Sequence, residues 1–130
     1  MMESAARPAT VLLVSQPGVM RSALHSILQS LSGAIIMNTD GALSACDLLE
    51  SQQTDSVVID ANLPLAERVA LLARIKRQFP LVFCLALTTT GRHHQLLKEA
   101  GADLILMQNC SREDIKRAVF SNNGEHDSAD

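Results

Sequence analysis

The sequence contains no tryptophan and no tyrosine, and aromatic residues make up only 2% of its 130 residues. Proteins that bind single-stranded nucleic acid stack its bases on aromatic side chains, and proteins that bind a duplex surround its phosphates with an excess of Lys and Arg. Here 11 Lys and Arg stand against 14 Asp and Glu, which gives a formal net charge of -3. The composition therefore predicts no direct contact with nucleic acid.

Long hydrophobic runs are also missing, because no apolar stretch approaches the ~20 residues that a membrane-spanning helix needs. The N-terminus carries Glu3 and no apolar stretch before Val11, so it lacks the pattern of a secretory signal. The three cysteines (Cys46, Cys84 and Cys110) are odd in number and form no CxxC pair, which favours reduced thiols and gives no zinc signature. We expect a cytoplasmic protein without membrane contact.

What is present is the composition of one globular domain. Hydrophobic residues make up 47% and charged residues 19% of a chain that is too short for two independent cores. We predict that residues 10–121 form this domain. Residues 1–9 are predicted to be a disordered N-terminus, and residues 122–130, which are polar and contain a glycine, a tail or linker.

Five short apolar runs alternate with stretches in which apolar residues recur at helical spacing. This pattern is typical of repeated βα units, so we predict an α/β fold with a doubly wound five-stranded parallel sheet and helices on both faces. The near-continuous hydrophobicity of the runs predicts strands covered on both faces. The predicted strands are residues 11–14, 34–37, 57–59, 81–87 and 104–107. The predicted helices are residues 20–31, 41–49, 65–79, 92–100 and 111–120, with Ser111 as N-cap of the last.

Polar residues follow the predicted strands, at the edge where open parallel sheets bind ligands. They are Ser15 and Gln16, Thr39 and Asp40, Asp60, Thr88 and Thr89, and Gln108 and Asn109. Asp60 is a lone carboxylate directly after a buried strand. Its position alone leaves two interpretations open: an aspartate that forms a turn, or the reactive group of a site.

Four segments around these strand ends carry a familiar pattern. They are SVVIDANLP at 56–64, DGALSA at 40–45, the Phe79-Pro80 pair followed by an apolar run to Thr88, and AGAD at 100–103. On these segments the chain from Thr10 to Phe120 resembles the receiver domain of two-component response regulators. VLLVSQPGVMRSALHSIL and QNCSREDIKRAV resemble the subgroup that carries a C-terminal LuxR-type helix-turn-helix.

The resemblance implies a flavodoxin-like receiver fold with the strand order 2-1-3-4-5. It places Asp60 at the phosphoacceptor position. It also implies four pocket positions and one switch position, which are Ser15, Gln16, Thr88 and Gln108 for the pocket and Ile105 for the switch. It further implies a role in transcriptional regulation, with a DNA-binding domain that would lie outside these 130 residues.

The chain departs from the family pattern at four positions, and at three of them a charged residue is replaced by an uncharged one. Ser15 and Gln16 stand where the family has an acidic pair, Gln108 stands where it has a lysine, and Ile105 stands where it has an aromatic residue. Phosphoryl transfer to a carboxylate depends on cations that neutralise the phosphoryl oxygens, and Mg²⁺ is usually held by carboxylates. Because Asp60 is the one carboxylate of this set, we expect no cofactor, or weak Mg²⁺ binding at most, and no metal site.

Three hypotheses for the function follow. The first is an atypical receiver domain, not an enzyme, that acts in transcriptional signalling through protein-protein interaction, largely without the standard phosphorylation cycle. The alternative is a working phosphoacceptor that takes phosphate on Asp60 from a histidine kinase. A third hypothesis is that the altered pocket binds another small ligand.

The partner is expected to be another protein or a second copy of the chain. We predict a homodimer formed through the region of the last helix, with Ile115 and Val119 packing inward. The basic residues of that helix (Arg112, Lys116 and Arg117) are expected to meet acidic groups on the partner.

Overall fold

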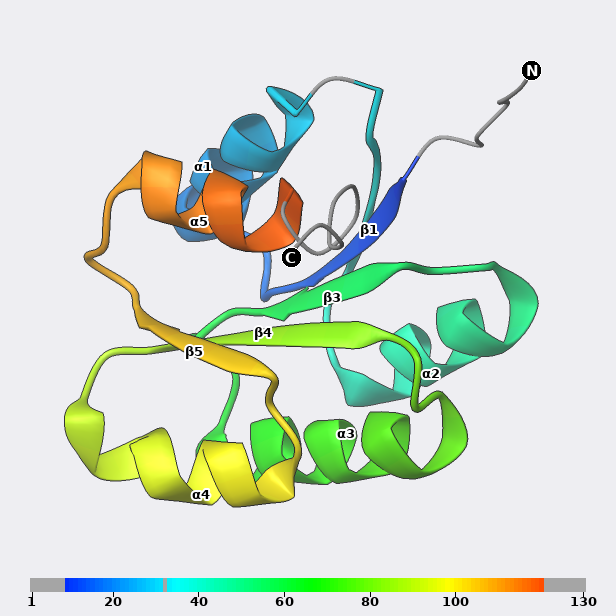
Figure 1. The fold of residues 1–130 in the computed structure, drawn as a ribbon, viewed down its shortest axis with the longest axis vertical. Helices are drawn as coiled ribbons and strands as arrows, with labels where there is room; N and C mark the ends of the chain where they lie inside the picture. The colour runs from blue at the N-terminus through cyan, green and yellow to red at the C-terminus, as the bar shows by residue number, and fades with distance from the viewer. Residues whose placement is uncertain (1–8, 32, 121–130) are drawn as a thin grey trace, which may run out of the picture.

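The structure is a computed structural model that describes residues 9–31 and 33–120, without the side chain of Phe120. The predictions for residues 1–8 and 121–130 lie outside the described residues. Strands and helices alternate along the described chain (Figure 1). The strands are β1 (Thr10–Val14), β2 (Ile35–Thr39), β3 (Ser56–Ile59), β4 (Phe83–Thr88) and β5 (Leu104–Met107). The helices are α1 (Val19–Gln29), α2 (Ala42–Ser51), α3 (Leu65–Gln78), α4 (His94–Ala100) and α5 (Arg112–Phe120).

The five strands form one parallel sheet in the order β2-β1-β3-β4-β5. This confirms the predicted doubly wound, flavodoxin-like sheet. The strand order reverses at β1, where Val14 lies between Thr39 of β2 and Ile59 of β3. The residues that follow β1 and β3 therefore emerge side by side at the carboxyl edge of the sheet.

Two layers of helices bury the two faces of the sheet (Figure 1). On one face, Leu28 of α1 and Val119 of α5 pack against the sheet, and on the other face α2, α3 and α4 supply residues such as Ile75 and Leu97. Ile115, with 2% exposure, and Val119 are buried, so they pack inward. The longest helix of the described chain has 14 residues, and none there is long and apolar enough to cross a bilayer.

The sequence prediction of strands covered on both faces is correct for β1, β3 and β4 and wrong for the two edge strands. Ile35 of β2 and both ends of β5, Leu104 and Met107, are exposed apolar residues. The helices lie over the middle of the sheet, so parts of the outermost strands stay open to solvent. Hydrophobicity alone did not distinguish an edge strand from a central one.

The fourth strand begins at Phe83, two residues later than predicted. Leu81 follows Pro80 in a turn that closes when the Val82 N–H donates to the carbonyl of Phe79 at 3.0 Å, and Leu81 is 96% exposed. The prediction treated an exposed turn leucine as part of the apolar strand.

Helix α2 begins through a contact with α3. The Ala42 N–H donates to Glu67 Oε2 at 2.8 Å, which satisfies one of the free amides at the start of the helix. A Cβ on Gly41 would lie 2.7 Å from the same oxygen, so a larger residue here would displace the end of the Glu67 side chain from this contact. The contact fixes the loop after β2 at the carboxyl edge of the sheet.

Candidate functional site at the carboxyl edge of the sheet

Asp60 lies at the strand-order reversal with its side chain fully buried. Its N–H donates to the carbonyl of Val14 at 2.9 Å, which continues the ladder between β1 and β3, and its residue exposure is 0%. Its Oδ2 accepts the Ser15 hydroxyl at 2.7 Å. Its Oδ1 accepts the side-chain amide of Gln108 at 2.9 Å and the Ala61 N–H at 2.7 Å. Uncharged donors therefore occupy both carboxylate oxygens.

Asn62 ties the loop after β3 to the loop after β1. Its Nδ2 donates to Ser15 Oγ at 3.1 Å and to the carbonyl of Gln16 at 3.3 Å, and its Oδ1 accepts the Gln16 N–H at 3.1 Å. The sequence prediction gave Asn62 no role. The available signal was its place two residues after Asp60, in the turn that leads to Leu63 and Pro64.

Two of the predicted pocket residues do not bring their side chains to Asp60. Gln16 is exposed and contributes its backbone groups to the contact with Asn62. Thr88 is buried, and its hydroxyl donates to the carbonyl of Thr90 at 2.9 Å and accepts the Thr90 N–H at 3.3 Å. The structure thus joins Ser15 and Gln108 to Asp60, and it engages the Thr88 hydroxyl within its own turn.

Ile105, at the predicted switch position, lies on β5 and is half-buried. It packs against the core formed with α2, α3 and α4. An aliphatic side chain thus fills the place where the family has an aromatic one.

Arg68 is a buried cation that the sequence prediction missed. Its side chain leaves α3 with 5% residue exposure, Nε donates to the carbonyl of Leu63 at 3.0 Å, and Nη1 donates to the carbonyl of Leu87 at 3.4 Å. Burial lowers the pKa of Arg68, and the charge of Asp60 opposes that lowering. The signal in the sequence was a charged residue four positions before Leu72, in the apolar stripe of a helix.

Residues 11–120 match the response regulator receiver domain family. The match spans most of the chain. This chain belongs to the response regulator receiver domain family. No curated protein matches it significantly in sequence.

Solved receiver structures share this fold. A signal receiver domain of an HD domain-containing protein from Pseudomonas fluorescens is 25% identical with a TM-score of 0.81, covering 93% of this chain and 90% of that one. The receiver domain of a sensor histidine kinase from Pseudomonas aeruginosa is 22% identical with a TM-score of 0.80, covering 91% and 99%. A DNA-binding response regulator of the LuxR family from Staphylococcus aureus is 18% identical with a TM-score of 0.77, covering 89% and 99%.

The Asp60 pocket of this receiver domain offers Mg²⁺ a single carboxylate, whereas the receiver domain from P. aeruginosa has a magnesium ion coordinated in its active site cleft. Mg²⁺ requires oxygen ligands in octahedral array and is usually bound through carboxylates. Asp60 already accepts three hydrogen bonds, and Asp40, which follows β2, pairs with Arg21 at 2.7 Å. Within residues 9–31 and 33–120, no three His, Cys, Asp or Glu side chains gather as metal ligands would.

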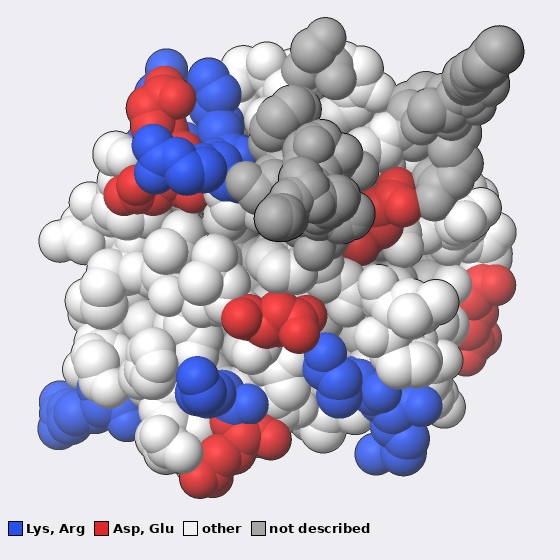
Figure 2. Space-filling model, in the orientation of Figure 1, with Lys and Arg blue, Asp and Glu red and all other residues white. Residues whose placement is uncertain are grey.

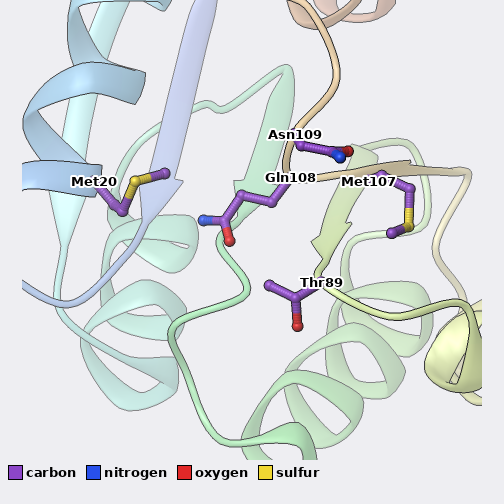
Figure 3. A pocket seen from close by; sticks show the side chains of 5 residues that line it. All are labelled: Met20, Thr89, Met107, Gln108 and Asn109. Atoms are coloured by element: carbon purple, nitrogen blue, oxygen red, sulfur yellow. The ribbon is translucent and has the colours of Figure 1, made fainter.

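A hollow of about 260 Å³ lies beside the Asp60 pocket (Figure 3). The side chain of Gln108, whose amide donates to Asp60, lies between Met20 and Met107 (Figure 3). No lining residue carries a charge, and the lining consists of Met20, Thr89, Met107, Gln108 and Asn109. The hollow therefore offers thioethers, amides and a hydroxyl, and no cation for a phosphoryl group.

Proposed function

We propose that this domain is an atypical receiver that acts in transcriptional signalling through protein-protein interaction, largely without the standard phosphorylation cycle. One observation carries the proposal. Asp60 is fully buried, and neutral donors from Ser15, Gln108 and Ala61 occupy both of its oxygens. The domain would thus be a binding module rather than an enzyme.

The hydrogen bonds to Asp60 oppose phosphorylation in two ways. Hydrogen bonds to a carboxylate oxygen draw electron density from it and make it a weaker nucleophile, and the donors here are held in turn, as Ser15 is by Asn62. The Gln108 amide also brings no charge to the transition state. Loss of one preorganised electrostatic stabiliser typically costs about 3 kcal/mol of barrier, and this pocket lacks both the acidic pair and the lysine of the family pattern.

The alternative function is a phosphoacceptor that takes phosphate on Asp60 from a histidine kinase. It is supported by the position of Asp60 at the carboxyl end of β3, where the strand order reverses, and by membership of the receiver family. Weak Mg²⁺ binding would suffice for this alternative only if Ser15 and Gln108 released the carboxylate.

Intact mass measured after incubation with acetyl phosphate and Mg²⁺ separates the two functions. We expect no phosphate adduct on the wild type. Asp60→Asn is the negative control, and a Ser15→Asp, Gln16→Asp, Gln108→Lys variant, which restores the charges of the family pattern, is the positive control. A stable adduct on the wild type that Asp60→Asn abolishes would replace the proposed function with the alternative.

We further propose a second copy of the chain as partner, bound through the α5 region. Arg112 is exposed, whereas Lys116 pairs with Glu113 at 3.7 Å and Arg117 pairs with Asp114 at 3.2 Å on the same helix. Figure 2 shows these opposite charges intermingled over α5, beside an uncharged surface over β5. Exposed pairs of this kind contribute little, so a partner's acidic groups can exchange with them.

The remaining parts of the proposal concern the cellular setting. The DNA-binding LuxR-family neighbour from S. aureus supports a role in transcription, with DNA bound by a separate C-terminal domain rather than by this chain. The net charge of -3 agrees with that division of roles. A cytoplasmic location belongs to the same proposal, whereas a small ligand bound in the hollow beside Gln108 is a separate hypothesis that a thermal-shift screen of metabolites would test.

A further inference from the structure

Arg68 holds a positive charge inside the protein without a carboxylate in contact. The two groups that accept hydrogen bonds from its guanidinium are the carbonyls of Leu63 and Leu87. The ion pairs between described residues do not include Arg68. Carbonyl groups satisfy donors but carry no net charge, and an uncompensated buried charge is costly. The side chain therefore needs an anion nearby.

Asp60 presents the complementary problem. It is a fully buried carboxylate whose hydrogen bonds come from a hydroxyl, an amide and a backbone N–H, none of them charged. It follows Ile59, which pairs with Ala86 of β4, and Arg68 donates to the carbonyl of the next residue of that strand, Leu87. Arg68 and Asp60 are therefore two buried charges of opposite sign, and each can compensate the charge of the other.

The two carbonyls bound by Arg68 belong to two different segments that lie beside Asp60. Leu63 belongs to the turn after β3, and Leu87 belongs to the end of β4. One guanidinium therefore joins the loop that follows Asp60 to the strand that carries Thr88. The guanidinium thus places a positive charge at the end of the sheet where Asp60 lies and holds two segments next to it.

We infer that Arg68 is the internal counter-cation of Asp60 and takes the place of a metal ion, for which this pocket offers a single carboxylate. The inference deepens the proposed function and rests on it, because a pocket with its own cation needs neither Mg²⁺ nor a phosphoryl group to hold one conformation. Arg68 is in this sense a positioning residue of the Asp60 site.

A double-mutant cycle between Arg68→Met and Asp60→Asn tests the inference by thermal unfolding. Each single substitution leaves one buried charge without its partner, so we expect Arg68→Met to lower Tm by about 10 °C or more. The double variant is expected to lose clearly less than the sum of the two single losses. Arg74→Met, on the same helix and bonded to Gln78 at 3.0 Å, is the matched control and is expected to be additive with Asp60→Asn. Additive losses for Arg68 as well would overturn the inference.

Arg68→Lys covers the case in which Arg68→Met does not fold. Lysine keeps the charge and loses the planar fork, so we expect it to retain most of the stability and the coupling to Asp60→Asn. Arg68→Gln removes the charge and is measured beside it. If Arg68→Lys lowers the Tm as much as Arg68→Gln does, the hydrogen bonds matter and the charge does not, and the inference would fall.

The response to Mg²⁺ gives a readout that a merely structural role would not move. Millimolar Mg²⁺ is expected to leave the wild-type Tm unchanged, to raise the Tm of the variant without the Arg68 charge, and to lose that effect when Asp60→Asn is added. Equal Mg²⁺ responses with and without Arg68 would contradict the inference. A phosphate adduct on the wild type would instead contradict the proposed function and leave the coupling between Arg68 and Asp60 intact.

Discussion

The ends of β3 and β4 lie side by side in the sheet, yet their polar groups are bonded in opposite ways. At the end of β3, Asp60 is held by residues 45 and 48 positions away, Ser15 and Gln108. At the end of β4, the Thr88 hydroxyl bonds to Thr90, two positions away. The first arrangement joins three strand ends, and the second closes one turn.

The difference shows that hydrogen bonds between strand ends hold the pocket together at Asp60 and not at Thr88. A carboxylate bonded to two other strand ends makes the β1-α1 loop, the β3-α3 loop and the end of β5 one unit. The Thr88 hydroxyl, at a predicted pocket position, is engaged within its own turn and donates to the carbonyl of Thr90 rather than to Asp60. A ligand that shifts a conformational equilibrium must bind the two states differently, and in this structure both the Asp60 carboxylate and the Thr88 hydroxyl are engaged in hydrogen bonds within the protein.

The largest effect is expected from Asp60→Ala. The substitution leaves the Ser15 hydroxyl, the Gln108 amide and the Ala61 N–H without an acceptor and removes the charge that faces Arg68. We expect a loss of about 3 kcal/mol or more in the free energy of unfolding, measured by urea denaturation. Asp40→Ala, which removes an exposed carboxylate paired with Arg21, is the control and is expected to cost about 0.5 kcal/mol or less. A stabilised Asp60→Ala protein would contradict the hydrogen-bonded pocket.

Smaller effects on the free energy of unfolding are expected from two substitutions that act on the end of β3 and the end of β4 separately. Ser15→Ala removes a donor to a buried carboxylate, for which we expect a loss of about 2 kcal/mol, and Thr88→Val removes a hydroxyl from one turn, for which we expect about 1 kcal/mol. In Thr88→Val, the Thr90 N–H should exchange its hydrogen faster, because it loses its acceptor, and the exchange rates of the strand amides should change little. Ser15→Ala should instead affect amides on both sides of Asn62. Identical exchange patterns in the two variants would show that the ends are coupled after all.

Much of the fold could be predicted from the sequence, because alternating apolar runs and helical spacing depend on short-range patterns. The neighbourhood of Asp60, Ser15 and Gln108 also followed, since parallel strands bring their carboxyl ends to one edge. The roles of Asn62 and Arg68 did not follow. They depend on where an individual side chain turns after its backbone is placed, and the partners of Arg68 are carbonyls, which every residue has. The exposure of Leu81 and the open sides of β2 and β5 likewise depend on packing that hydrophobicity does not encode.

A further prediction tests whether self-association through the α5 region is independent of the Asp60 site. Lys116→Glu with Arg117→Glu should weaken self-association several-fold in sedimentation experiments while the fold stays intact, because charge at an interface rim sets association and partner choice. Arg74→Glu with Arg77→Glu makes the same charge change on α3 and is the control. Acetyl phosphate should alter neither result. A wild-type monomer at every concentration, or a dimer that both variants leave unchanged, would remove the α5 region from consideration.

The last prediction extends the comparison of β3 and β4 to high pH. Cys84 near the start of β4 is fully buried, and burial, with a smaller contribution from Asp103, raises its pKa to about 12. In the unfolded chain a cysteine releases its proton near pH 8.5. Above that pH the unfolded state binds fewer protons than the folded state, so stability is complete below about pH 8.5 and falls as the pH rises toward 12, at up to about 1.4 kcal/mol per pH unit.

Cys84→Ala should flatten that part of the pH profile of the unfolding free energy, although the variant is less stable at neutral pH because it leaves space in the core. Cys110→Ala is the matched control: burial, followed by Asp114, also raises the pKa of that thiol, but Cys110 is only half-buried, so its variant should keep most of the slope. A profile between pH 9 and 11 that is unchanged by Cys84→Ala would mean that the β4 thiol ionises in the folded state. The contrast between a carboxylate supplied with donors and a thiol sealed in apolar surroundings would then not hold.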